Sequence, residues 1–472
     1  MANQSLAAKQ QAGNGRLIAI IAMFFLFAMI SFVTNLAAPI GTIWGYKFEG
    51  STTLGMMGNM MNFLAYLVMG IPAGNLLVKI GYKKTALWAM GVGFVGLFVQ
   101  WLSSQVGGDI NLCEMTSTVK ENGVEVLKTF QIPLNFIIYL LGAFICGFCV
   151  CMLNTVVNPM LNLLGGGGNK GNQLIQTGGA LNSLAATLTP FFVGALIGAL
   201  TPATSIANVA PLLWIAMGVF VASFVVISFV AIPEPNKSAQ GGKVKYAHSP
   251  WNFRHTVLGV IGIFFYVGIE VGIPATLNFY LADQTAEGAG VVGKASVIAG
   301  AIVAIYWLLM LVGRSLSSLI SGAVSSRAQI ITVSSVAILL VIAAILTPKS
   351  VTVPVPEFIY EAGATVPLSA FLLVICGLCT SVMWGAIFNL AVEGLGKYTA
   401  QASGIFMMMV VGGGIMPLIQ SAMVGWVGYI SSYWLIVAML AYILFYGVAG
   451  SKNVNTDIPV NEEDENQVPD AI

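Results

Sequence analysis

Long apolar stretches separated by short polar turns recur along the whole chain and constrain its fold more than any other feature. A helix needs about 20 apolar residues to cross the hydrocarbon core of a bilayer. Stretches of this length lie at 17–37, 54–78, 84–103, 132–163, 174–200, 210–232, 255–281, 295–320, 328–347, 367–392, 399–424 and 430–449. Charged residues make up only 8% of the chain, whereas soluble proteins contain roughly 25%. The sequence therefore predicts an all-α membrane protein with twelve transmembrane helices.

The longest polar stretch inside the chain divides the predicted spans into two groups of six. It covers 233–254 and has the Gly-, Ser- and Lys-containing composition of a flexible linker. We expect six-helix bundles at 17–232 and 255–450, a polar tail at 1–16, and an acidic, disordered tail at 451–472.

The two halves share a local pattern. Lys170 is followed twenty residues later by Pro190, and Lys397 is followed twenty residues later by Pro417. Each lysine lies in a glycine-rich turn, and a helix rich in small residues leads from the turn to the proline. This pattern indicates two parallel repeats of a six-helix unit with a site near the bilayer midplane.

Positive charges predict the orientation, because Lys and Arg concentrate in cytoplasmic segments. If 1–16 lies in the cytoplasm, fourteen of the nineteen Lys and Arg residues fall on that side. We therefore expect both termini and 233–254 in the cytoplasm. The loops 104–131 and 348–366 are then outside and long enough to carry local structure. No cleavage site follows the first residues, so we interpret the first span as a retained helix and not a signal peptide.

Several functional classes are excluded by what the chain contains. Cys146 and Cys149, like Cys376 and Cys379, have a spacing found at metal and redox sites. Each pair lies in an apolar span without a neighbouring His, so we interpret these cysteines as packing residues. The chain has no basic patch for nucleic acid, no phosphate loop and no paired catalytic groups. We expect no enzymatic activity, no metal and no cofactor.

One acidic residue lies unusually deep in an apolar span. Glu270 is in the middle of 264–274, FFYVGIEVGIP, within an apolar run from Val257 to Leu281. A charged side chain at bilayer depth costs at least about 2.5–3.5 kcal/mol, and such residues face a water-filled cavity and take part in function. Glu270 is therefore the first candidate for a functional residue.

Several blocks of the sequence, among them EGLGK at 393–397 and NTVVNP at 154–159, resemble the fucose:proton symporter family of the major facilitator superfamily, and its glucose/galactose transporter branch in particular. The block 389–420, NLAVEGLGKYTAQASGIFMMMVVGGGIMPLIQ, carries the resemblance most specifically. Further matching blocks are NTVVNP at 154–159, ALNSLAATLTPFFVG at 180–194, FFYVGIEVGI at 264–273, and the AYLVMGIPAG and IGYKK parts of 65–84. The resemblance covers nearly all of the chain.

This resemblance implies the major facilitator fold, with twelve transmembrane helices in two six-helix halves. It implies a multi-pass protein of the bacterial inner membrane that works as a monomer. The implied activity is import of a monosaccharide, either a hexose or a deoxyhexose or amino sugar, by alternating access. A co-transported proton or sodium ion is the implied driving force.

The residues through which this family usually couples transport to protons are missing. Ala38 stands where the family has an Asp after Thr-Asn-Leu, and Asn154 stands where the fucose carrier has a Glu. Val78 replaces an acid of the superfamily motif. Gly179 replaces the Gln of the fifth span, with Gln176 one turn earlier. The fold and the general activity thus carry over, but proton coupling by the usual residues does not.

A sugar site needs directional hydrogen bonds and an aromatic face in a mostly apolar pocket. The polar and aromatic side chains predicted at mid-span form the candidate substrate-binding set: Asn35, Asn154, Asn158, Gln176, Asn182, Tyr266, Glu270, Asn278, Tyr306, Trp384 and Asn389. Charged residues near the predicted cytoplasmic ends of the spans are the candidates for gating: Lys83, Lys84, Arg314, Glu393 and Lys397.

Three roles are open for Glu270: a proton carrier in coupling, a hydrogen-bond acceptor for sugar hydroxyls, or a buried structural acid. Alternatives are also open for the whole chain. It could be an uncoupled facilitator, a carrier of another small polar solute, or a sensor that keeps the fold. An organic-acid carrier is disfavoured, because Arg314 is the one basic residue near a span interior and lies toward a span end.

Overall fold

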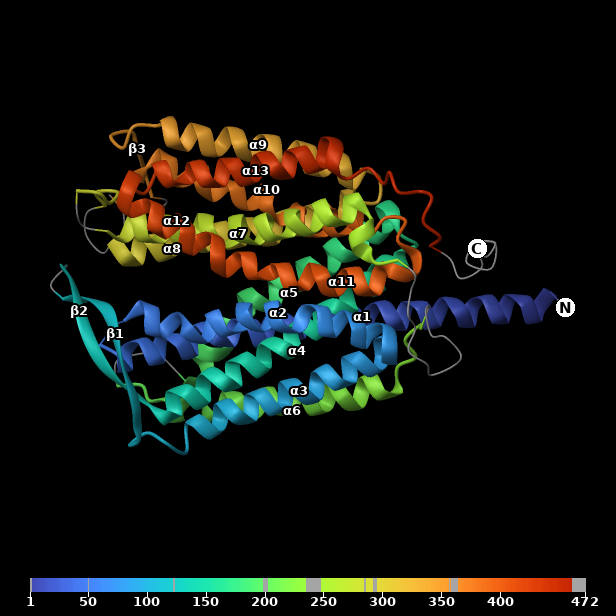
Figure 1. The fold of residues 1–472 in the computed structure, drawn as a ribbon, viewed down its shortest axis with the longest axis horizontal. Helices are drawn as coiled ribbons and strands as arrows, with labels where there is room; N and C mark the ends of the chain where they lie inside the picture. The colour runs from blue at the N-terminus through green and yellow to red at the C-terminus, as the bar shows by residue number, and fades with distance from the viewer. Residues whose placement is uncertain are drawn as a thin grey trace, which may run out of the picture. The chain divides into compact units, whose positions relative to one another are not determined.

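The computed structural model describes residues 2–49, 51–121, 124–197, 203–234, 248–283, 286–291, 295–355, 357 and 364–460. A helix forms at each of the twelve predicted spans. The helices of the first half are α1 (Ala2–Lys47), α2 (Thr52–Ile80), α3 (Tyr82–Ser103), α4 (Leu134–Gly165), α5 (Gly168–Ile197) and α6 (Ala210–Phe229) (Figure 1). Those of the second half are α7 (Arg254–Ala282), α8 (Ala295–Ile320), α9 (Ser326–Leu346), α10 (Leu368–Ala391), α11 (Thr399–Met408), α12 (Gly412–Val427) and α13 (Trp434–Phe445).

Within the described residues, eleven helical segments are long and apolar enough to cross a membrane. The predicted span that is not among them is α5, a helix of 30 residues that begins with a run of Gly, Asn and Gln. The predicted span at 399–424 is made by α11 and α12 together, joined by the short 3-10 turn Met409–Val411. Glycines 412–414, which favour helix poorly, directly follow this interruption, whereas α12 continues through Pro417.

Both long loops carry the local structure that the sequence predicts. β1 (Asn111–Glu121) and β2 (Val124–Pro133) form an antiparallel hairpin, and β3 (Thr352–Pro354) pairs with β4 (Thr365–Pro367). The first hairpin is tied to the turn between α1 and α2. Ser117 Oγ lies 2.6 Å from Ser51 Oγ, and Lys128 Nζ lies 2.7 Å from Glu49 Oε2.

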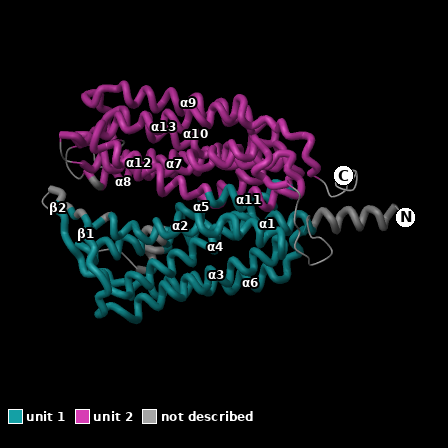
Figure 2. The backbone as a smooth tube through the Cα atoms, viewed as in Figure 1, with its two compact units in different colours: residues 1–164, 184–245, 403–408 teal, residues 165–183, 246–402, 409–472 magenta. Residues whose placement is uncertain are grey.

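The chain forms two compact units (Figure 2). Unit 1 comprises residues 1–164, 184–245 and 403–408, and unit 2 comprises residues 165–183, 246–402 and 409–472. Two helices are thus divided between the units: α5 after residue 183 and α11 after residue 402. The predicted linker at 233–254 lies outside the described residues from 235 to 247, and the predicted acidic tail lies outside them from 461 onward.

Each unit has an apolar core rich in aromatic residues. In unit 1, Trp44 and Phe136 pack with their ring centroids 4.8 Å apart, and Trp44 and Tyr139 pack at 5.5 Å. In unit 2, Gly412 brings α12 directly against the backbone of Phe264 on α7, so that no side chain could be accommodated between them. Close backbone approach at glycine is the usual means of packing helices in lipid.

Candidate functional site

An ion pair lies in unit 2 between α7 and α8. Arg314 Nη2 is 2.9 Å from Glu270 Oε1, and the two side chains are 14% and 17% exposed. Arg314 also donates through Nη1 to Ser183 Oγ at 2.7 Å, and its Nη2 lies 3.5 Å from Tyr266 Oη. The four side chains come from α5, α7 and α8, so this charged cluster joins three helices.

The depth of the pair explains why its two charges must meet. Glu270 is twelve residues from the end of α7 at Ala282, about 18 Å along the helix axis. A charge this deep within an apolar span pairs with another charge or with backbone groups. Removing one partner of a buried pair costs about 3–5 kcal/mol, because the other charge is then left uncompensated.

Arg314 is one of the residues predicted to act in gating near the ends of the spans. Arg314 is six residues from the end of α8 at Ile320, but its guanidinium contacts Glu270. Helical side chains point back toward the helix N-terminus. The long side chain of Arg314 therefore extends toward the middle of α8, away from the end of the span.

Aromatic side chains flank the charged cluster. The rings of Trp384 on α10 and Tyr266 lie with centroids 6.1 Å apart and planes tilted by 55°. Trp384 is partly exposed, whereas all the other residues from 379 to 392 are buried. Tyr306 is fully buried, and its hydroxyl lies 3.0 Å from Thr380 Oγ1. Trp384 thus offers an aromatic surface beside the charges, whereas Tyr306 braces α8 against α10.

The beginning of α5 packs against α10 through an amide. Gln176 is buried and donates through Nε2 to the carbonyl oxygen of Val382 at 2.8 Å. Gly385 makes this approach feasible, because a Cβ atom there would lie 2.9 Å from Gln176 Nε2. Ser183, two turns further along α5, carries the contact with Arg314. Gln176 positions α5, and one of its two amide N–H donors is used in this contact.

In unit 1 the predicted polar residues form hydrogen bonds without charges. Asn154 Nδ2 on α4 donates to Tyr66 Oη on α2 at 2.7 Å, and Asn158 Nδ2 donates to the carbonyl oxygen of Asn154 at 2.9 Å. On α1, Asn35 Nδ2 donates to the carbonyl oxygen of Ser31 at 2.8 Å. Asn154 and Asn158 are buried, and Asn35 is half-buried.

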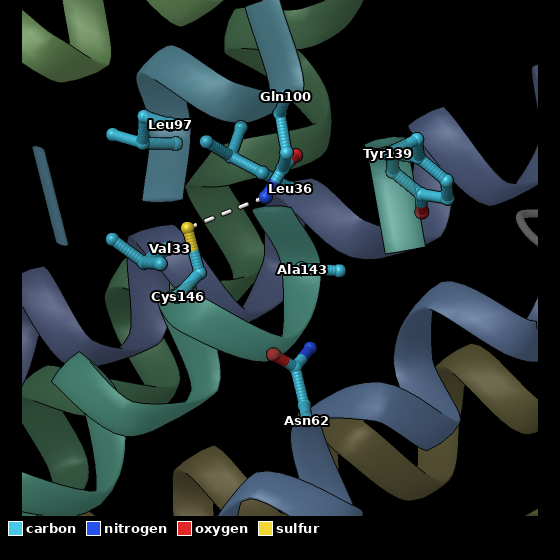
Figure 3. A pocket seen from close by; sticks show the side chains of 8 residues that line it. All are labelled: Val33, Leu36, Asn62, Leu97, Gln100, Tyr139, Ala143 and Cys146. Atoms are coloured by element: carbon cyan, nitrogen blue, oxygen red, sulfur yellow. Dashed lines mark hydrogen bonds between the residues drawn. The ribbon is translucent and has the colours of Figure 1, made fainter. Parts of the chain in front are cut away.

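Unit 1 also contains a small internal cavity between α1, α2, α3 and α4 (Figure 3). It is lined by Val33, Leu36, Asn62, Leu97, Gln100, Tyr139, Ala143 and Cys146. Gln100 Nε2 donates to Cys146 Sγ at 3.3 Å on its wall. The space open to a water centre is about 10 Å³, which is close to the minimum for one water molecule. This cavity is too small for a sugar, and none of the predicted substrate residues lines it.

The remaining predicted residues lie away from the charged cluster. Asn389, near the end of α10, donates to Ser326 Oγ at 2.9 Å and thus joins α10 to the start of α9. Asn278 on α7 and Asn182 on α5 are half-buried. Lys83 Nζ donates to the carbonyl oxygen of Ser228 at 2.7 Å, within unit 1. Lys84 and Glu393 are exposed, and Lys397 is buried.

Sequence reasoning missed two participants. Ser183 and Tyr66 have no distinguishing pattern, because a lone hydroxyl in an apolar helix is common. The Glu270–Arg314 pair had a usable signal. Both charges fall within predicted spans of neighbouring helices, and intramembrane charges seek each other.

The comparisons with known proteins identify the family. Residues 20–415 match the profile of the Major Facilitator Superfamily, and the chain belongs to this family. It is 29% identical over 442 residues to a glucose/galactose transporter of Brucella abortus, with 92% of this chain and 94% of the relative covered. It is 22% identical over 454 residues to the L-fucose-proton symporter of Escherichia coli, with 90% of each chain covered.

Solved structures agree on the fold. A crystal structure of the Escherichia coli fucose:proton symporter matches with a TM-score of 0.71 at 16% identity, covering 92% of this chain and 100% of that chain. The proton:xylose symporter bound to 6-bromo-6-deoxy-D-glucose matches with a TM-score of 0.62 at 13% identity, covering 90% and 95%. The expected fold class, an all-α membrane protein with the major facilitator fold, is confirmed.

Proposed function

We propose that this protein imports a monosaccharide across the bacterial inner membrane by alternating access. The observation that carries the proposal is the cluster of Glu270, Arg314, Tyr266 and Ser183 beside the partly exposed Trp384. A sugar hydroxyl both donates and accepts hydrogen bonds, and this cluster supplies acceptors and donors around one aromatic face. The relatives named for glucose/galactose and for L-fucose support the substrate class.

In this proposal the charged cluster binds the sugar. The Glu270 carboxylate and the Ser183 hydroxyl bind sugar hydroxyls, while Trp384 covers an apolar face of the sugar ring. Asn154 and Asn158 of α4 remain candidate sugar ligands of unit 1 in their own right. Charge pairs at the span ends form and break as the carrier changes state, and the residues that act there are Lys83, Lys84, Glu393 and Lys397.

Coupling to a cation is the second part of the proposal. A proton on Glu270 would remove the ion pair and leave Arg314 Nη2 free to donate to the sugar, while Nη1 keeps its bond to Ser183. Sugar binding and proton binding would then favour each other, which is the requirement for symport. The alternative is an uncoupled facilitator. It is supported by the Glu270–Arg314 ion pair, because the two charges cancel without a bound proton.

The orientation in the membrane is also a proposal. We place both termini in the cytoplasm and the β1–β2 hairpin outside, with the protein acting as a monomer. Single cysteines introduced at Thr116, exposed in β1, and at Val454, exposed after α13, test this in intact cells in a Cys113→Ser background, because Cys113 is itself exposed on β1. An impermeant maleimide should label the first, and should label the second only after the cells are opened.

Uptake into proteoliposomes tests the substrate class. Glucose, galactose, fucose and N-acetylglucosamine, each radiolabelled, are offered with a proton gradient, a sodium gradient or no gradient. Saturable uptake of at least one sugar, inhibited by the unlabelled sugar, is the expected result. Failure of all of them in a preparation that is folded by size-exclusion chromatography would refute the proposal.

A further inference from the structure

The segment after α13 turns back across one end of unit 2. Residues 451–460, here called the C-terminal strap, follow the π-helical turn Tyr446–Gly450 and lie, red in Figure 1, at the end where α7 begins. Asn453, Asn455 and residues 458–460 are half-buried, whereas Lys452, Val454, Thr456 and Asp457 are exposed. The burial alternates because one side of the strap rests on the helices beneath it.

The strap supplies the N-terminal cap of α7. The first N–H groups of a helix have no partner within that helix. Phe253, which precedes α7, has no side chain that can cap, and no local side-chain cap is formed. Instead, the N–H of Arg254 donates to Asn455 Oδ1 at 2.9 Å. Asn453 Oδ1 accepts from the N–H of Asn455 at 3.1 Å and holds this part of the strap in a turn.

A second anchor joins the strap to the turn after α10. The N–H of Lys397 donates to the carbonyl oxygen of Val460 at 3.1 Å. Gly394 and Gly396 have φ angles of +71° and +48°. A Cβ at Gly394 would lie 2.9 Å from Asn453 Nδ2, and one at Gly396 would lie 3.0 Å from Val460 Cβ. The Glu-Gly-Leu-Gly-Lys block thus has glycines where the backbone is left-handed and where the strap makes close contact.

The same turn leads into a helix that both units share. Thr256 Oγ1 donates to the carbonyl oxygen of Ala391 at 2.9 Å, and His255 Nε2 lies 2.9 Å from that of Glu393. The start of α7 and the end of α10 are therefore bonded to each other beneath the strap. α11 begins at Thr399, directly after the turn, and its residues 403–408 belong to unit 1. Restraining the turn restrains the start of this shared helix.

We propose that the C-terminal strap is a conformational restraint that slows the transport cycle by holding the α10–α11 turn against the start of α7. During the cycle α11 moves relative to unit 2, and the strap contacts at Arg254 and Lys397 release. The restraint does not depend on which solute the protein carries, so this proposal does not require that the substrate is a monosaccharide.

A reversible cross-link tests the movement. Arg254→Cys and Asn455→Cys are combined in full-length protein that carries Cys113→Ser, because Cys113 is the exposed native cysteine among those described. Oxidation should reduce sugar counterflow at least about tenfold, and reductant should restore it, since a closed disulfide prevents release. The single variant Asn455→Cys, treated in the same way, is the control. Unchanged counterflow in the fully cross-linked protein would overturn the proposal.

Weakening the strap tests the opposite direction. Loss of a helix cap changes a local equilibrium about fivefold, so Asn455→Ala should speed amide hydrogen exchange at 395–402 and raise counterflow by a similar factor. Thr456→Ala is the matched exposed control. A chain that stops after Lys452 should behave like Asn455→Ala, and a chain that stops after Val460 should behave like wild type.

Hydrogen exchange needs no substrate, so the two proposals fail separately. If wild type transports none of the sugars, the proposed function fails while exchange at 395–402 still reports on the strap. Equal rates of amide hydrogen exchange at 395–402 in Asn455→Ala and Thr456→Ala would refute the proposed role of the strap.

Discussion

The first helices of the two halves, α1 and α7, solve the same packing problem with different chemistry. Each contains an internal proline, Pro39 in α1 and Pro274 in α7. The residue four positions before the proline is Asn35 in α1 and Glu270 in α7. Asn35 bonds to Ser31, one turn back in its own helix. Glu270 bonds to Arg314 on another helix.

The difference follows from what each side chain can accept and donate. An amide donates, so Asn35 can be satisfied by a carbonyl oxygen of its own helix. An ionised carboxylate only accepts, and the backbone N–H groups of a helix interior are already used. Glu270 must therefore find a donor on a neighbouring helix. A carboxylate in place of an amide thus turns a position that is satisfied within its own helix into one that links α5, α7 and α8. We therefore expect substitutions in unit 2 to have the largest effects on folding and transport.

Breaking the ion pair should have the largest effect. Arg314→Leu leaves Glu270 without its cation, which costs about 3–5 kcal/mol in a buried pair. We expect folded yield on fluorescence-detected size exclusion to collapse and transport to be lost. Arg314→Leu combined with Glu270→Leu should recover much of the yield without recovering transport. A well-folded, active Arg314→Leu protein would show that the pair does not stabilise unit 2.

Neutralising Glu270 without changing its shape should separate exchange from accumulation. If transport is proton-coupled, Glu270→Gln mimics the protonated carrier permanently. It should still exchange sugar for sugar, but uphill accumulation should vanish, because the empty carrier cannot release a proton. If Glu270 only binds sugar hydroxyls, exchange and accumulation should weaken together. Counterflow and gradient-driven uptake in the same vesicles separate these results, and accumulation preserved in Glu270→Gln would eliminate the coupling role.

Removing the aromatic face should weaken sugar affinity moderately. Trp384→Ala should raise the Kd for sugar about tenfold, in line with about 1.5 kcal/mol for a specific aromatic contact. The folded yield should stay near wild type, because Trp384 is partly exposed. Trp307→Ala on α8 is the matched control, since Trp307 is 44% exposed. Equal affinities of Trp384→Ala and wild type in isothermal titration would remove Trp384 from the site.

The amides of unit 1 should matter least. Polar contacts between membrane helices average about 0.6 kcal/mol, which corresponds to about a threefold change. Asn35→Ala and Tyr66→Phe should each change transport by no more than this factor. An effect of Asn35→Ala as large as that of Arg314→Leu would abolish the contrast between α1 and α7.

Much of the fold was predictable because span length and hydrophobicity are local properties. Every predicted span contains a helix, although α11 and α12 replace a single continuous one. The site was less predictable. Gln176 and Asn389 have side-chain amides of the kind that bind sugars. In the structure, however, Gln176 bonds to Val382 of α10, and Asn389 bonds to Ser326 at the start of α9. Whether an amide is consumed by packing depends on how its helix is rotated, which hydropathy does not report.

The sequence by itself determined the helical spans and the depth of Glu270 within one of them. These follow from the cost of placing polar groups in hydrocarbon, which each residue incurs wherever its helix packs. Only the tertiary structure decided that the partner is Arg314, that Ser183 of α5 joins them, and that Asn455 caps α7. Each of these contacts joins different helices or segments. They depend on helix rotation, side-chain direction and the reach of a long side chain, quantities that arise only when the helices are packed together.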